Sequence, residues 1–134
     1  EERIAREERE VRALHAQQQR QREIEDQDRQ RLIEERDDAK RALDLLMSAL
    51  TDHQRETYLK HGYIPVVTKS GNVYRIKRGW AHNIHRYKGD RHIETLCAHS
   101  SVMMPKEDNI LGQMLQLQCN EEEFRKLANI SRAA

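Results

Sequence analysis

The sequence predicts an α+β protein in which a long charged N-terminal helix precedes a small domain. Three observations support this. The first fifty residues contain no Gly or Pro and are rich in good helix formers. Between residues 63 and 97 apolar residues recur at every second position, and after residue 105 they recur at helical spacing. We expect a charged helical rod over residues 1–42 and a small α+β domain over 43–134, with a three- to four-stranded antiparallel meander and two C-terminal helices.

The composition limits what this chain can be. Charged residues make up 35% and apolar residues 37%, against about 25% and 45–50% in ordinary domains. One globule therefore cannot bury all 134 residues. The 24 basic and 23 acidic side chains almost cancel. No apolar run approaches the ~20 residues that span a bilayer, and two cysteines predict reduced thiols rather than a disulfide scaffold. The first residue is glutamate, which predicts a processed chain.

The rod is predicted to gain stability from charge pairs along its surface. Acidic residues precede basic ones by four positions at Glu2–Arg6, Glu8–Arg12, Glu25–Arg29 and Asp37–Arg41. Each such pair contributes about 0.2–0.5 kcal/mol to a helix.

A heptad register places apolar residues at both ends of the rod, which is compatible with a coiled coil. The middle, residues 17–31, offers only Ile24, and this is a poor seam for a two-stranded coil. Two interpretations follow: a helix held at its ends against a partner or a second copy, or a solvated single helix. We favour the first, because helices this polar seldom persist alone. The predicted oligomerisation contacts are Ile4, Val11, Leu14, Leu32, Leu43 and Leu46.

The small domain begins with a dense apolar stretch at residues 42–50 and a short helix. Thr51 and Gln54 have the spacing of a capping box, in which the threonine hydroxyl caps the helix and the glutamine reaches back. A helix over residues 52–61 should follow, and Gly62 is placed to end it in the left-handed conformation.

The remaining elements follow from turn residues and periodicity. Segments 64–68 and 73–78 flank a turn, and segments 80–87 and 91–97 flank a second one, as in antiparallel hairpins. A helix is predicted over residues 108–118. Asn120 then begins a last helix that carries Phe124, Leu127 and Ile130.

Positive charge is concentrated in the strands. Residues 69–91 hold seven basic side chains and one acidic one, with aromatic residues between them. Such a surface binds nucleic acid in many proteins. It can equally be a solvated face, or one that meets an acidic protein, because Tyr74 and Ile76 share the strand face opposite Arg75 and Lys77. The predicted nucleic-acid or partner-binding residues are Lys69, Arg75, Lys77, Arg78, Trp80, Arg86, Lys88 and Arg91.

Residues of metal-binding type also occur in this half of the chain. His82, His85, Cys97 and His99, with His92 nearby, are side chains that zinc accepts. His82 and His85, however, lie three apart on the predicted strand and so point to opposite faces. We therefore expect no metal site.

Residues that could form a catalytic pair occur in the same segment. Cys97 with His99, or Ser100 and Ser101 with His99, could form a nucleophile and base. No nucleophile elbow and no phosphate-binding glycine loop accompanies them. We therefore expect no catalytic residues, no cofactor and no small-molecule substrate.

Four segments resemble a group of short proteins from bacteriophage and bacterial genomes over residues 43–130. The resemblance rests on residues 61–63, 74–79, 96–99 and 124–129, and the segment 80–84 departs from the group's pattern. It implies a phage-type setting, in the virion or the host cytoplasm, and transfers no functional residues. The resulting hypothesis is a non-enzymatic structural protein that assembles through its long helix as a homo-oligomer or within a virion-type complex. The alternative is a nucleic-acid-binding module that uses the basic strands 69–91.

Overall fold

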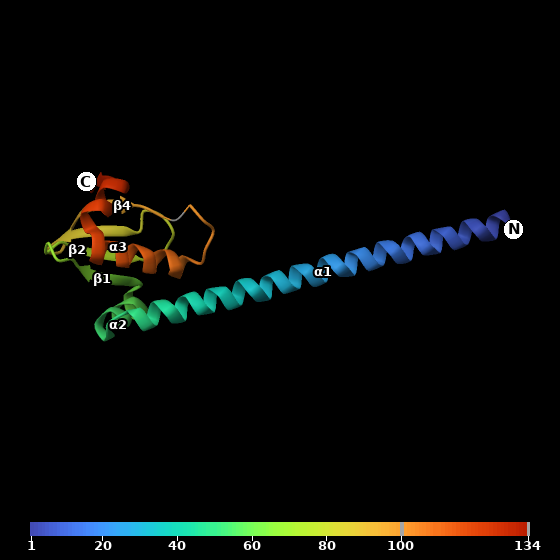
Figure 1. The fold of residues 1–134 in the computed structure, drawn as a ribbon, viewed down its shortest axis with the longest axis horizontal. Coiled ribbons are helices and arrows are strands. Elements are labelled where there is room, and N and C mark those ends of the chain that lie inside the picture. Colours follow the sequence, from blue (N-terminus) through green and yellow to red (C-terminus); the bar gives the residue numbers. More distant parts are fainter. Residues whose placement is uncertain (100, 134) are drawn as a thin grey trace. The chain divides into compact units, whose positions relative to one another are not determined.

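The computed structural model describes residues 1–99 and 101–133, and its chain divides into two compact units. They are Glu1–Asp37 and Asp38–Ala134, and we call the second the module. The division falls five residues before the predicted one. The fold is α+β, with a long N-terminal helix followed by a five-stranded antiparallel sheet and a C-terminal helix (Figure 1).

Helix α1 (Glu2–Ala49) is continuous and runs through the first unit into the module. Exposed charge pairs line it, although only Glu8–Arg12 among the predicted pairs is formed. Arg6 instead contacts Glu10, and Arg29 and Arg41 contact aspartates three residues before them. In a sequence this rich in acids, each arginine has several partners at helical spacing, and the choice among them is energetically small.

Helix α2 (Asp52–His61) begins and ends as predicted. The Thr51 hydroxyl accepts a hydrogen bond from the Gln54 amide, and the Gln54 side chain accepts one from the Thr51 amide. Gly62 has φ 77° and ends the helix. The Arg55 guanidinium donates to the carbonyl oxygens of Met47 and Leu50, which satisfies the exposed carbonyls at the end of α1.

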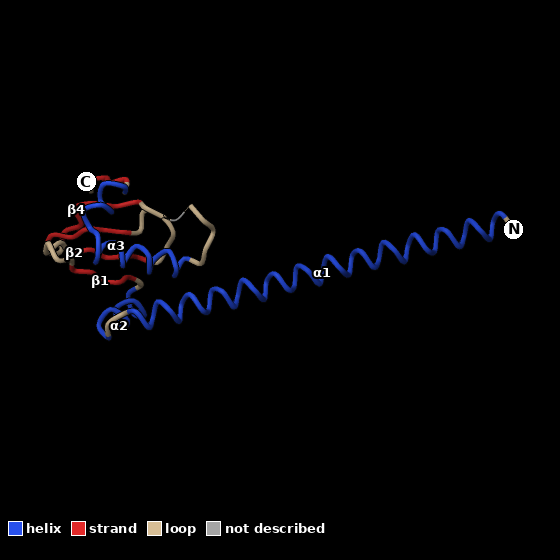
Figure 2. The backbone as a smooth tube through the Cα atoms, in the orientation of Figure 1, coloured by secondary structure: helices blue, strands red, loops and turns tan. Residues whose placement is uncertain are grey.

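The sheet has five strands that pair in chain order. They are β1 (Tyr63–Val67), β2 (Val73–Lys77), β3 (Ile84–Lys88), β4 (Arg91–Cys97) and β5 (Asn129–Arg132), and strands are drawn in red in Figure 2. The predicted strand over 80–87 begins only at Ile84, because Trp80–Asn83 form a loop. The fifth strand is a correction: Ile130 lies opposite Leu96 in β5 and not in a helix. Pairing with β4 at the edge of the sheet determines its conformation, and this contact is far away in sequence.

Helix α3 (Lys106–Leu127) contains both predicted C-terminal helices. It is broken at Asn120, whose φ of −152° and ψ of 48° are not helical. The predicted boundary at Asn120 is thus a kink within one element. Phe124, after the kink, is 4% exposed, whereas Leu127 is 82% exposed.

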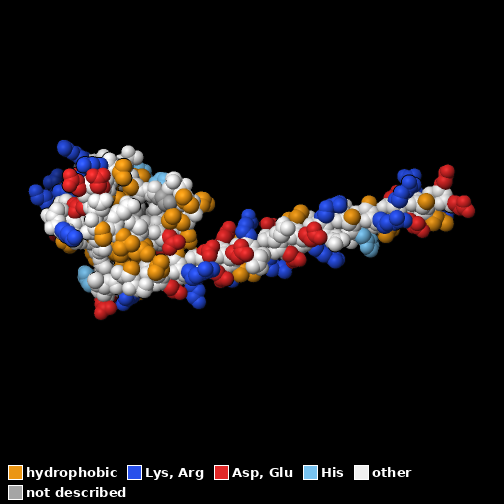
Figure 3. Space-filling view, viewed as in Figure 1, with side chains coloured by type: hydrophobic (Ala, Val, Ile, Leu, Met, Phe, Trp, Pro, Cys, Tyr) orange, Lys and Arg blue, Asp and Glu red, His pale blue; other side chains and the backbone are white. Residues whose placement is uncertain are grey.

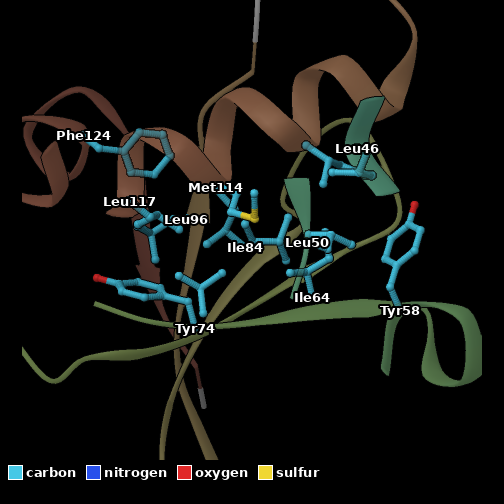
Figure 4. Packing of buried hydrophobic residues seen from close by; sticks show 13 residues of the cluster. Leu46, Leu50, Tyr58, Ile64, Tyr74, Ile84, Leu96, Met114, Leu117 and Phe124 are labelled. Atoms are coloured by element: carbon cyan, nitrogen blue, oxygen red, sulfur yellow. The ribbon is translucent and has the colours of Figure 1, made fainter. Parts of the chain in front are cut away.

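The core lies between one face of the sheet and the helices of the module. Figure 4 shows side chains from α2, α3, the end of α1 and the strands converging there. Leu46 is 0% exposed and belongs to this core. The prediction that Leu46 is an oligomerisation contact is therefore wrong, because the helix that carries it is already packed at that position.

Candidate interaction surfaces

Helix α1 presents an apolar edge in the first unit. Ile4, Val11, Leu14 and Leu32 are 56%, 54%, 52% and 55% exposed. At 3.6 residues per turn they fall within an arc of about 80° on the helix, and we call these four residues the apolar edge. Figure 3 shows single apolar side chains spaced among charged ones along α1. Leu43, the other predicted contact that stays accessible, is 38% exposed and belongs to the module.

The sheet has an inner and an outer face. Tyr74 and Ile76 are fully buried on the inner face, so the alternative in which Tyr74 is a core residue is the correct one. Side chains that alternate with them point outward, and paired residues on neighbouring strands share a face. The outward positions, which we call the outer face, include Tyr63, Arg75, Lys77, His85, Tyr87, His92 and Thr95.

A stacked row of side chains crosses the outer face. The Arg75 guanidinium carbon lies 4.6 Å from the Tyr63 ring centre and 4.0 Å from that of Tyr87. The Tyr87 and His92 rings are 5.5 Å apart. His92 stacks on His85 at 4.1 Å with an angle of 8° between the rings. The row therefore extends from β1 across β2 and β3 to β4.

His85 is partly buried within this row. Burial lowers the pKa of His85 below its ordinary value, and the nearby charges of His92 and Lys77 lower it further. Its Nδ1 atom is buried and has no hydrogen-bond partner among the described residues. His85 therefore resists taking up a proton where an exposed histidine would accept one.

Three of the eight predicted binding residues make hydrogen bonds or ion pairs within the module. The Arg78 guanidinium donates to the Tyr58 carbonyl at 2.9 Å, at the end of α2. Arg86 forms an ion pair with Glu94 at 3.2 Å. Trp80 lies in the loop before β3, where its carbonyl accepts a hydrogen bond from Asn109. The half-buried charge of Arg86 thus serves the fold, because a charge removed from water requires a partner nearby. Arg78 is exposed and makes its contact at the surface.

The other five predicted residues remain available. Arg75 lies in the stacked row, and Lys69, Lys77, Lys88 and Arg91 are exposed. No ion pair involves any of the five within the described residues. The turns after β1 and β3 lie at the same end of an antiparallel meander, so Lys69, Lys88 and Arg91 share one end of the sheet. Figure 3 shows Lys and Arg side chains gathered at one end of the module.

A network on the inner face fastens α3 to the sheet. Glu94 pairs with Arg86 and, at 2.9 Å, with Arg125, which also donates to the Tyr74 hydroxyl. Tyr74 donates in turn to Glu121. Burial acts to raise the pKa of Glu94, but the hydrogen bonds and charges of Arg125 and Arg86 outweigh it and hold that pKa below its ordinary value.

Glu121 is held in the same way by neutral donors. Burial acts to raise its pKa, and hydrogen bonds from Thr68, Asn72, Ser70 and Tyr74 together lower it. These contacts connect the segment of α3 after the kink to the turn between β1 and β2. Glu94 and Glu121 are therefore structural anions, and neither lies on the outer face.

The residues considered for metal binding and catalysis are distributed differently. His82 lies in the loop before β3 with φ 54°, so its predicted place on a strand is wrong. Within the described ranges no three His, Cys, Asp or Glu side chains are placed to hold a metal ion. Cys97 and His99 line a cavity of about 600 Å³ beside α3. Ser100 lies outside the described residues. No helix in the described part of the chain is apolar over a membrane-spanning length.

Four members of the stacked row are missing from the predicted binding residues: Tyr63, His85, Tyr87 and His92. Tyr63 precedes the basic segment and His92 follows it, so a search for charge within residues 69–91 omits both. Pairing the predicted hairpins and asking which residues share a face with Arg75 would have found them.

Comparison with known proteins gives no relationship. The chain matches no protein-family model, no curated protein and no solved structure. The resemblance to bacteriophage and bacterial proteins therefore stays a prediction, and the apolar edge and the outer face are the features that bear on function.

Proposed function

We propose that this chain is a non-enzymatic assembly protein that associates with a second copy of itself through α1, as a structural component of a phage-type complex. The apolar edge carries this proposal. Its four residues are each more than half exposed in a unit that holds no buried residue of its own. Self-association would bury these side chains, at about 25 cal/mol for each Å² of apolar surface removed from water.

Charge along the helix favours an antiparallel pair. In a parallel pair in register, the seam would place Glu7, Glu25, Asp28 and Glu35 opposite their own copies. Like charges opposite each other at an interface are strongly unfavourable. With the second helix reversed so that Leu14 lies opposite Leu32, the same register places Gln21 opposite Glu25 and Gln18 opposite Asp28. No seam position then joins two like charges between residues 9 and 37.

Sedimentation velocity of the full chain over a concentration series tests the association. We expect a dimer that dissociates on dilution, and we expect the double variant Leu14→Glu with Leu32→Glu to remain a monomer. The matched control is Leu59→Glu on α2, where the leucine is 61% exposed, and it should assemble as the unaltered chain does. A monomer at every concentration, or a double variant that assembles normally, would overturn the proposal.

Disulfide trapping tests the orientation separately. In a chain whose Cys97 and Cys119 are serine, we would prepare Leu14→Cys and Leu32→Cys as two single variants. An antiparallel pair should form disulfide-linked dimers when the two variants are mixed and few when either is oxidised alone. Efficient linkage of Leu14→Cys to itself would instead indicate a parallel pair, while leaving the association intact.

A further inference from the structure

We propose that the outer face of the sheet binds single-stranded nucleic acid through its phosphate groups, with Arg75 at the centre of the site. This activity is separate from association through α1, because it uses other residues in the other unit. Three features support this site: the way Arg75 is held, the charges around it and the shape of the face.

Arg75 is held in a fixed orientation with its hydrogen-bonding edge available. Tyr63 from β1 and Tyr87 from β3 lie on its two sides, since β2 runs between those strands. Stacking of this kind leaves the N–H groups in the guanidinium plane, where they bind phosphate oxygens bidentately. Within the described residues, no hydrogen bond or ion pair engages this guanidinium. An arginine that is already ordered loses little conformational entropy when it binds an anion.

The charges around Arg75 are mostly positive, with Asp90 in the turn between β3 and β4 as the exception. Lys77 is its neighbour on the same face of β2, and Lys69, Lys88 and Arg91 lie at the end of the sheet. Among the described residues, no Asp or Glu occupies an outward position of a strand: Glu94 faces inward, in contact with Arg125. At about 3.3 Å per residue and 4.8 Å per strand, Lys77 and Lys88 are roughly 17 Å apart. This spacing requires a ligand with several anionic groups.

The shape of the site favours a flexible strand that is bound by its backbone. A single strand can bend to follow cations that run from Lys77 and Arg75 on the outer face to Lys69, Lys88 and Arg91 at the end of the sheet. Duplex DNA is stiff, with a persistence length of about 50 nm, and would touch such a face along one line. Tyr87 is stacked between Arg75 and His92, which come from strands on its two sides, so it offers no ring face to a base. We therefore expect little base preference, unlike binding by stacking platforms.

Fluorescence anisotropy with labelled oligo-dT, across a salt series, tests the proposal on the full chain. The unaltered chain should bind with a steep salt dependence, and Lys77→Gln with Lys88→Gln should weaken binding at least tenfold. The slope of log K against log salt should fall by about 1.4, since each contact to single-strand phosphate contributes about 0.7. The control Lys60→Gln with Lys126→Gln changes the net charge equally and should alter affinity less than twofold. Arg75→Gln should reduce affinity and slope as well, with folding checked by circular dichroism.

Several other results of this titration would overturn the proposal or assign the site to a different ligand. No binding at low salt, or equal losses in the control and test variants, would overturn the proposal. Tighter binding to a matched duplex would overturn the single-strand assignment, and equal binding to poly-glutamate would indicate an acidic protein instead. Repeating the titration with the Leu14→Glu, Leu32→Glu variant separates this site from association, because its binding should persist in a monomer.

Discussion

The first unit and the module are stabilised by different physical means. Helix α1 from Glu2 to Asp37 has exposed side chains throughout, and its charge pairs contribute at most about 0.5 kcal/mol each. The module has a core of apolar side chains that are nearly all excluded from water, and burying each stabilises the fold by about 1.5–3 kcal/mol. The high proportion of charged residues in the whole chain therefore coexists with a module that has an ordinary apolar core. The same comparison predicts that equal substitutions will have unequal effects in the two regions.

The largest effect should come from removing a core leucine. Leu46→Ala should lower the free energy of unfolding of the module by about 2–5 kcal/mol, because it leaves a cavity in the core. Leu32→Ala, on the same helix at 55% exposure, should change that free energy by less than about 0.5 kcal/mol. Urea unfolding followed by the fluorescence of Trp80 measures both. Equal losses from the two substitutions would mean that the stable core of the module extends along α1 as far as Leu32.

Removing a half-buried anion should have the next largest effect. Glu94→Gln leaves Arg86 and Arg125 without their shared carboxylate and should cost about 1.5–3 kcal/mol. Glu56→Gln, which breaks an exposed pair with Lys60, should cost less than about 1 kcal/mol.

The pH dependence of Glu94→Gln provides a second check. The pKa of Glu94 is lower in the folded chain, so its stabilisation is present above the unfolded value of about 4.3 and is lost as the pH falls through the folded value. Urea unfolding at pH 7 and at pH 3 should therefore give a smaller difference between Glu94→Gln and the unaltered chain at pH 3. A difference that does not change with pH would assign the loss to packing rather than to charge.

The features that the sequence predicted correctly are those that neighbouring residues determine. The capping box at Thr51 and Gln54 and the left-handed Gly62 depend on contacts within one turn, and both are formed. Strand β5 was not predicted, because Ile130 becomes a strand residue only by pairing with Leu96. For the same reason, the sequence did not predict the ion pair between Arg86 and Glu94. A charged residue in a strand is normally expected to face solvent, and its partner lies on another strand.

The outer face shows the same limit for the candidate site. Charge and aromatic content identified Arg75 and Lys77, and alternation placed them on one face correctly. Composition does not distinguish a charged side chain that already has a hydrogen-bond partner in the module, such as Arg78, from one that remains available. That distinction depends on the carbonyl at the end of α2, which is twenty residues away from Arg78 in the chain.

Protonation of His85, one of the two stacked histidines, should have a smaller effect on stability. The pKa of His85 is lower in the folded chain than its value of about 6.5 in the unfolded chain. The unfolded chain therefore binds more protons just below pH 6.5, and stability should fall as the pH drops from 7.5 to 5.5. Glu94 and Glu121 titrate at lower pH and do not contribute in this range. The variant His85→Gln should flatten the dependence, and a slope that persists in it would assign the effect to another group.

Replacing a histidine by glycine should have the smallest effect on stability, and the sign of that effect should differ between the two regions. His82 has φ 54°, a conformation that glycine adopts without strain, so His82→Gly should stabilise the module by up to about 1 kcal/mol. His15 lies inside α1, where glycine is a poorer helix former, and His15→Gly should reduce helix stability by about 0.5 kcal/mol. Urea unfolding measures the first, and the far-ultraviolet circular dichroism of the full chain measures the second. A destabilising His82→Gly would show that contacts of the imidazole outweigh the backbone strain at this position.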